Sequence, residues 1–258
     1  MRLSVIIITR NEADNIVDCL ASVAFADECI VLDSGSTDQT VALARAAGAR
    51  VEVADDWPGF GPQKNRALAL ARGKWVLSLD ADERITPALA RQIQTVLADP
   101  DAARAYAIPR LSSFCGKFIR HSGWWPDPVV RLFQRGHGRF TEALVHERLL
   151  TDQPAAMLTQ PMLHYTYPDL TSAVQKMNRY SSDAATMMYA KGRRASLASA
   201  VGHGAWTFIR IYGLRRGFLD GGHGFVLAVV AAMGSFTRYA KLAFLSRHLP
   251  AKPPYEGS

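Results

Sequence analysis

The fold is decided by the stretch "WVLSLDADER", residues 75–84, in which an apolar run ends abruptly in carboxylates. Between 76 and 79 the large apolar residues occupy both odd and even positions, which predicts a strand covered on both faces, as in a parallel sheet packed between helices. The run is followed directly by Asp80 and Asp82. The stretch therefore predicts a buried strand that carries charge at its carboxyl end.

Asp80, Asp82 and Glu83 place three acids within four positions. In an extended segment alternate side chains share a face, so Asp80 and Asp82 are expected to project the same way. Two like charges held this close cost free energy unless a cation lies beside them. The pair therefore predicts a cation site. The alternative is that Asp82 caps a helix that follows.

Strand and helix patterns alternate through the first hundred residues. The expected strands are 3–8, 29–33, 50–54 and 75–80. The expected helices start after Asn11-Glu12, after a cap at Ser36 or Thr37, within 62–73, and at Pro87. This alternation predicts an α/β fold with a doubly wound, mostly parallel sheet flanked by helices. In such folds the ligand crevice lies at the carboxyl ends of the strands.

Polar residues gather at that edge of the predicted sheet. They are Thr9, Asn11 and Glu12 after the first strand, Asp33 and Ser34 after the second, and Asp80, Ala81 and Asp82 after the fourth. Several such residues at one edge favour a single ligand site over a capping role for Asp82 alone.

The charge of the chain is distributed unevenly. The 258 residues carry a formal charge of +7, but residues 184–258 hold ten Lys/Arg against two acids, and the first 183 residues hold 20 bases and 21 acids. A local anionic partner for the C-terminal region is therefore expected. We expect a cytoplasmic protein with reduced cysteines, because the three cysteines lack metal-like spacing and the N-terminus lacks a signal-peptide pattern.

Several stretches of the sequence resemble a known family. "SVIIITRNEADNI", "IVLDSGSTDQT" and "KNRALALARGKWVLSLDADE" are similar to successive motifs of family 2 glycosyltransferases, which are inverting enzymes with the GT-A fold. The later "GWWPDPVVRLFQRG", "VHE", "HYTY" and "YGLRRGFLDG" resemble the lipopolysaccharide-core β-1,4-glucosyltransferase branch. The resemblance implies a nucleotide-sugar donor, most simply UDP-glucose, and a lipid-linked glycan acceptor such as an inner-core heptose.

The resemblance also implies residue roles. Asp33 is expected to accept from the nucleotide base, with the donor pocket completed by Thr9, Asn11, Glu12, Ser34, Asp80 and Ala81. Asp82 is expected to bind Mg²⁺ or Mn²⁺ at the diphosphate, with His146 as a further ligand. Lys64 and Asn65 could approach the diphosphate or ribose; the alternative for Lys64 is a solvated helix lysine.

An inverting transfer needs a base for the acceptor hydroxyl, and carboxylates usually serve. Asp127 is the first candidate and Glu147 the second. Trp124 and Trp125 offer a surface for sugar stacking on the acceptor side. Arg131 could orient carboxylates or an anionic acceptor, and a core salt bridge is its alternative.

Other functional classes fit less well. A haloacid-dehalogenase-type phosphatase expects Thr or Val where Arg84 stands, and nucleotidyltransferase or dinucleotide-binding loops expect glycines that "TRNEADN" lacks. A non-catalytic nucleotide-sugar-binding scaffold, or a transferase acting on another membrane-linked glycan, stays open. Nucleic acid is not an expected partner, because the basic tail interleaves arginines with long apolar runs.

The predicted organisation is a GT-A domain over 1–168, with donor binding in 1–100 and the acceptor side in 101–168, followed by a helical region over 169–258. Residues 195–248 combine basic, aromatic and aliphatic side chains in segments marginal as membrane spans. We expect them to dock on an anionic membrane, on the inner face of the cytoplasmic membrane, without crossing it. The oligomeric state is left open.

Overall fold

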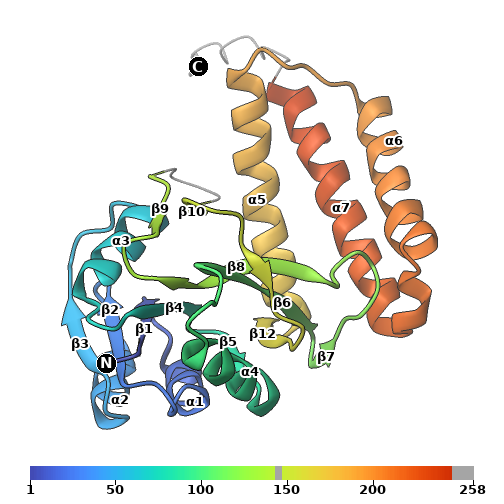
Figure 1. Cartoon of the computed structure of the whole chain (residues 1–258). Coiled ribbons are helices and arrows are strands. Elements are labelled where there is room, and N and C mark those ends of the chain that lie inside the picture. The colour runs from blue at the N-terminus through green and yellow to red at the C-terminus, as the bar shows by residue number, and fades with distance from the viewer. Residues whose placement is uncertain (143–146, 246–258) are drawn as a thin grey trace, which may run out of the picture. The chain divides into compact units, whose positions relative to one another are not determined.

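The computed structural model describes residues 1–142 and 147–245 (Figure 1). The chain forms two compact units. The first unit contains Met1–Ser112 and Pro126–Thr166, and the second contains Ser113–Trp125 and the described residues from Tyr167 onward.

The first unit is built on one large sheet. Its strands run in the order β3 (Arg50–Val53), β2 (Glu28–Asp33), β1 (Leu3–Thr9), β4 (Trp75–Asp80), β8 (Asp127–Gln134), β6 (Ala105–Phe114), β12 (Met162–Tyr167) and β5 (Glu83–Ile85). Strands β3, β2, β1 and β4 are mutually parallel, whereas β8 is antiparallel to both β4 and β6. Short strands β7 (Lys117–Phe118) and β11 (Ala156–Met157) pair with β6, and β9 (Gly138–Phe140) pairs with β10 (Leu149–Thr151).

Helices cover both faces of this sheet (Figure 1). On one face α1 (Ala13–Ser22), α2 (Thr40–Ala46) and α4 (Pro87–Ala98) pack against alternate residues of β1 and β4. On the other, α3 (Phe60–Leu70) packs against β1, β2 and β9. Strands β1 and β4 are buried on both faces, which is why they carry few polar residues before their carboxyl ends.

The predicted strands and the α/β fold are confirmed, whereas the alternative role of Asp82 and the expected cap of the second helix are wrong. Asp82 caps no helix, because β5 follows it and α4 begins only at Pro87, where the Thr86 side chain accepts from the Leu89 N–H. Helix α2 begins at Thr40 without a side-chain cap, and the Ser36 hydroxyl instead bonds Asp33.

The second unit is helical. Its described elements are α5 (Leu170–Ala190), α6 (Leu197–Phe208), a π-helical segment η1 (Ile209–Leu214), a 3₁₀ turn η2 (Gly217–Asp220) and α7 (Gly222–Leu245). Helix α7 packs beside α5 and α6 (Figure 1). Among residues 1–142 and 147–245, α7 alone is long and apolar enough to cross a membrane, judged by length and composition. A core helix can satisfy the same criterion, although only 28% of the apolar window is buried.

Candidate functional site

The carboxyl ends of β1 and β2 are joined by a buried hydrogen-bond cluster. The Thr9 hydroxyl donates to Asp33 Oδ2 at 3.0 Å. The N–H of Ser36 donates to Asp33 Oδ1 at 2.8 Å, and the Ser36 hydroxyl to Oδ2 at 2.5 Å. Asp33 is fully buried, and a carboxylate has about four acceptor positions. Asp33 therefore holds its own loop in shape, and a contact to a nucleotide base would add to these bonds.

The loop after β1 is fixed against the loop after β2. Asn11 adopts a left-handed conformation with φ 57°, and its side-chain oxygen accepts from the Thr37 N–H at 2.8 Å. The Glu12 N–H donates to the Thr40 hydroxyl at 2.8 Å. Burial raises the pKa of Glu12, and the nearby charges of Asp82 and Asp80 raise it further. Glu12 therefore belongs to the same acidic region as the motif Asp80-Ala81-Asp82, called here the D-x-D.

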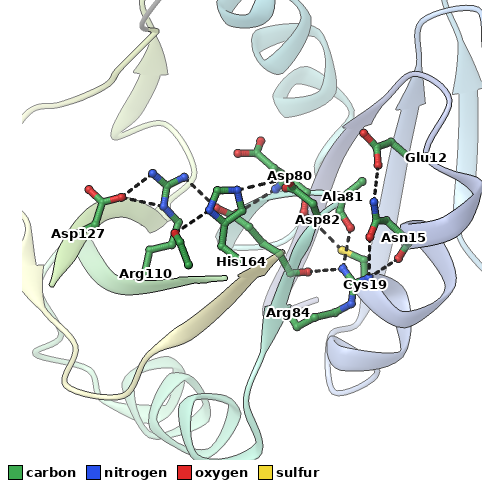
Figure 2. Close-up of polar contacts among 12 residues, drawn as sticks. Glu12, Asn15, Cys19, Asp80, Ala81, Asp82, Arg84, Arg110, Asp127 and His164 are labelled. Carbon is green, nitrogen blue, oxygen red and sulfur yellow. Dashed lines mark hydrogen bonds and ion pairs between the residues drawn. The ribbon is translucent and has the colours of Figure 1, made fainter. Parts of the chain in front are cut away.

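The turn that follows β4 is tied to α1 (Figure 2). Arg84 donates to the carbonyls of Ala81 at 2.7 Å and Asn15 at 2.9 Å, and Asn15 in turn donates to Glu12 at 2.9 Å. Ala81 is buried. These contacts hold Asp80 and Asp82 at the edge of the sheet, beside the loops of Thr9 and Asp33.

Lys64 bridges two carboxylates. Its Nζ lies 2.9 Å from Asp80 Oδ1 and 2.9 Å from Glu147 Oε1, and the residue is 3% exposed. The alternative of a solvated helix lysine is therefore wrong. The buried Lys64 therefore connects Asp80 to Glu147, the second candidate base.

Arg131 reaches the D-x-D from a β-bulge. In β8 the neighbours Val130 and Leu132 pair with adjacent residues of β6, so Arg131 is the extra residue in the register. Bulges of this kind redirect a side chain near a site. The Arg131 guanidinium binds Asp80 and also the fully buried Glu83, the latter at 2.6 Å.

This environment sets the ionisation of Asp80. Burial raises the pKa of its carboxyl, but the charges of Arg131 and Lys64 and their hydrogen bonds lower it more, so the pKa lies well below its usual range. Asp80 is therefore ionised throughout the neutral range. The core salt bridge, which is the alternative role of Arg131, is present, and one of its partners is Asp80 of the D-x-D.

Asp127 is held by an arginine that sequence reasoning missed. Arg110 lies opposite Asp127 in the β6–β8 register and donates to its Oδ2 from two nitrogens, at 2.6 and 3.0 Å (Figure 2). The Nη1 atom of Arg110 also lies 3.5 Å from Glu83 Oε1. A lone arginine within the apolar run "AYAIPRLSSF" was the available signal. Glu83 thus links the arginine beside the D-x-D to the arginine beside Asp127.

A histidine that sequence reasoning missed lies beside Asp82. Residue His164 pairs with Glu83 in the antiparallel β5–β12 register, and its Nε2 lies 3.2 Å from Asp82 Oδ2 (Figure 2). Its other ring nitrogen lies 2.9 Å from the Ser112 hydroxyl. A carboxylate is a suitable ligand for Mg²⁺ or Mn²⁺, and an imidazole fixed by a second contact can add a nitrogen ligand for a divalent transition metal. No group of three or more His, Cys, Asp or Glu able to hold a metal occurs in the described part of the chain.

Other predicted site residues take different positions. Asn65 uses both amide atoms on the backbone of Phe140, each at 2.9 Å, so we leave it out of the proposed donor site. Ser34 is buried, and its hydroxyl accepts from Gln63 at 3.0 Å. His146, the expected further metal ligand, lies outside the described residues.

The two tryptophans of the expected acceptor side belong to the second unit. Trp124 packs in an aromatic cluster, with ring centroids 6.2 Å from Phe114 and 6.0 Å from Tyr167. The guanidinium of Arg120 lies 6.0 Å from the Trp125 ring centroid. Sugar stacking by these rings stays a prediction.

Comparisons with known proteins identify the family of this chain. The model of glycosyl transferase family 2 matches residues 4–151, more than half of the chain. The lipopolysaccharide core biosynthesis glycosyltransferase LpsC of Rhizobium meliloti is 30% identical over 264 residues, covering 97% of this chain and 95% of that protein. The chain therefore belongs to glycosyl transferase family 2.

A solved structure that spans nearly the whole chain agrees on the fold. The S. aureus TarS fragment 1–349 covers 95% of this chain and 90% of its own, with a TM-score of 0.50 and 15% identity. The fold of this chain is GT-A. Glucosyl-3-phosphoglycerate synthase of Mycobacterium tuberculosis, solved with Mn²⁺, UDP and glucosyl-3-phosphoglycerate, is 29% identical over 43% of this chain and 44% of its own, with a TM-score of 0.37. The same enzyme has been solved with Mg²⁺ and UDP.

Proposed function

We propose that this chain is an inverting hexosyltransferase that moves glucose from UDP-glucose onto a saccharide hydroxyl of a lipid-anchored acceptor, the inner core of lipopolysaccharide. The observation that carries the proposal is the placement of Asp80 and Asp82 beside Thr9 and Asp33 at one edge of a family 2 sheet. The similarity to LpsC along nearly the whole chain supports the acceptor class.

The charge balance of the site supports a divalent cation. Asp80 is neutralised by Lys64 and Arg131, whereas the ion-pair partner of Asp82 among the described residues is His164, which is charged only when protonated. A diphosphate brought to this acidic edge would be repelled without a cation. We propose that Asp82 and His164 hold Mg²⁺ or Mn²⁺, which would neutralise the negative charge of the departing nucleotide.

The proposed base is Asp127. It would accept the proton of the acceptor hydroxyl as that oxygen attacks the anomeric carbon from the side opposite the nucleotide. Arg110 holds the Asp127 carboxylate through Oδ2 alone, so the carboxylate can be oriented by one oxygen and receive a proton at the other. Glu147 is the second candidate, but its Oε1 is engaged by Lys64.

We also propose that the chain works at the inner face of the cytoplasmic membrane as a peripheral protein. The support is the excess of basic residues in 184–258 together with the exposed apolar surface of the helical unit. A lipid-linked acceptor would place substrate and enzyme on one surface.

The direct test is transfer from UDP-glucose to purified, truncated core acceptors, with the anomeric configuration of the product determined by NMR. We expect a β-linked product and loss of transfer with a chelator. Calorimetry of UDP binding with Mn²⁺ tests the metal separately. UDP affinity that is unchanged in Asp82→Ala, or unchanged by chelator, would contradict the metal role, and retention of the donor's configuration would contradict inversion.

A further inference from the structure

The helical unit keeps large apolar side chains exposed. Of the twenty-four exposed large hydrophobic residues in the described chain, sixteen lie between Leu170 and Leu245. The most exposed of these is Leu214, at 66%. Phe218 and Leu219, which lie within five residues of it in sequence, are 50% and 53% exposed. These three lie in the turn between α6 and α7, residues 209–221, called here the α6–α7 turn.

The α6–α7 turn is rigidly constructed. Arg216 adopts a left-handed conformation with φ 55°, and Gly217 has no room for a side chain because a Cβ there would lie 2.8 Å from the Ile211 carbonyl oxygen. A Cβ on Gly224 would lie 1.9 Å from the carbonyl oxygen of Gly217. Backbone segments of the turn and of the start of α7 therefore pass close to one another at these glycines. This close packing fixes the direction in which the neighbouring apolar side chains project.

A buried carboxylate clamps a second loop to this turn. Asp220 accepts from the backbone N–H groups of Arg120 and His121, at 3.1 and 3.0 Å. Its backbone carbonyl accepts from Lys117 Nζ at 2.8 Å. Asp220 is 3% exposed, so its negative charge is paired with donors inside the unit and does not reduce the positive charge of the surface.

Aromatic side chains support the turn from within. The rings of Phe208, Tyr212 and Phe225 pack against one another, with centroid distances of 5.4 Å between Phe208 and Tyr212, 5.6 Å between Tyr212 and Phe225, and 5.9 Å between Phe208 and Phe225. The scaffold thus holds Leu214 and Leu219 in place without covering them. Leu214, Phe218 and Leu219, called here the apolar tip, thus form an exposed apolar surface that is held in a defined place. Such a surface indicates contact with another molecule.

The charge around the tip indicates what covers it. Arg210, Arg215 and Arg216 lie in the turn itself and are exposed, and Lys117 and Arg120 lie on the clamped loop. From Ala184 to Leu245 the sequence contains one acid, the buried Asp220. Two copies of this surface facing each other would bring like charges together. An anionic lipid surface complements both the arginines and the apolar tip.

We propose that the α6–α7 turn is the element that enters the membrane interface, with Leu214, Phe218 and Leu219 among the acyl chains and Arg210, Arg215 and Arg216 at anionic headgroups. The inference deepens the peripheral attachment proposed above and rests on it. It assigns docking to one end of the helical unit rather than to the whole of 195–248.

Vesicle flotation tests the charged part of the proposal. Arg210→Gln with Arg216→Asn should weaken binding to vesicles of phosphatidylglycerol and phosphatidylcholine by about fivefold per residue, as expected for about 1 kcal/mol each. Asn is chosen at 216 because it tolerates a left-handed backbone. The control is Arg193→Gln with Arg194→Gln, which removes the same charge beyond the opposite end of α6. The control should bind as the wild type does.

A second pair of variants tests the apolar part. Leu214→Ser with Leu219→Ser should reduce flotation by about tenfold or more, because both side chains lose their apolar contact with lipid. Met187→Ser with Leu197→Ser is the matched control, since these residues are also exposed but lie at the other end of the unit. Thermal midpoints verify that each variant is folded.

The outcomes separate this inference from the proposed function. Equal losses in tip and control pairs, or no loss in either tip pair, would overturn the assignment to the α6–α7 turn. Conversion of a wild-type dimer into a monomer by the leucine pair, with vesicle binding unchanged, would assign the surface to a second copy instead. Transfer to a lipid-free acceptor is measured in parallel, and its failure in the wild-type protein would count against the proposed function alone.

Discussion

Arg110 and Asp127 face each other across the β6–β8 register, and two guanidinium nitrogens of Arg110 donate to the same oxygen, Asp127 Oδ2, at 2.6 and 3.0 Å. The same arginine lies 3.5 Å from the buried Glu83, which also binds Arg131. The candidate base and the D-x-D are therefore connected by alternating charges.

Asp127→Asn should lower turnover by about 10²-fold or more, because the amide keeps the shape of the side chain but is not basic. The affinity for UDP with Mn²⁺ should be nearly unchanged, which calorimetry measures. Glu147→Gln is the paired variant. If Glu147→Gln abolishes transfer and Asp127→Asn does not, then Glu147 is the base and the assignment made here is wrong.

His164→Ala should weaken the metal-dependent part of UDP binding by about tenfold or more, since a ligand beside Asp82 is lost. UDP binding without metal should stay as in the wild-type protein. His137→Ala is the matched control, because His137 pairs with Asp152 at the surface and has no contact with the D-x-D among the described ion pairs. Metal dependence that survives unchanged in His164→Ala would remove His164 from the proposed metal site.

The fold followed from sequence because its signals are local. The apolar run before Asp80 and the alternation of strands and helices each depend on neighbouring residues, and they correctly placed the polar residues at the carboxyl ends of β1, β2 and β4. The same locality explains the predicted helix start at Pro87, which is confirmed. The sheet order beyond β4 depends on long-range pairing, for which the sequence carries no comparable signal.

The candidate site was only partly predictable for the same reason. Arg110 and His164 reach the site through cross-strand registers, with Asp127 and Glu83 as their respective partners. Arg131 was identified by its neighbours in sequence, but the bulge that turns it toward Asp80 depends on the register with β6. Contacts of this kind appear only once strand pairing is known.

Gly61→Ala should destabilise the first unit by about 1–3 kcal/mol or more. A Cβ at residue 61 would lie 1.7 Å from the Thr141 carbonyl oxygen, so the backbone of α3 or of the segment at Thr141 must move. Gly202→Ala is the control, because a Cβ there meets nothing within 4 Å in α6. It should stabilise the chain by about 0.5–1 kcal/mol through helix propensity. Equal unfolding free energies for the two variants in denaturant titrations would contradict the close contact.

The final prediction concerns the dependence of stability on pH. The carboxyl of Asp80 has a pKa below its ordinary value of 3.8 in the folded chain, despite burial, because of Arg131 and Lys64. A carboxylate with a lowered pKa stabilises the folded state above the unfolded-state value, and that contribution is lost as the pH falls below it. The wild-type free energy of unfolding should therefore decrease on acidification below about pH 4.

Asp80→Asn should flatten this dependence and lower stability at pH 7 by about 1–3 kcal/mol, since the two cations lose a charged partner. Asp56→Asn is the control. The hydrogen bond from Arg66 lowers the pKa of Asp56, but this pair is exposed and screened by solvent, so the effect on stability should be small. Urea titrations from pH 7 to pH 3 measure both variants. An Asp80→Asn protein that loses as much stability as the wild type between pH 5 and pH 3 would show that other carboxylates govern acid unfolding.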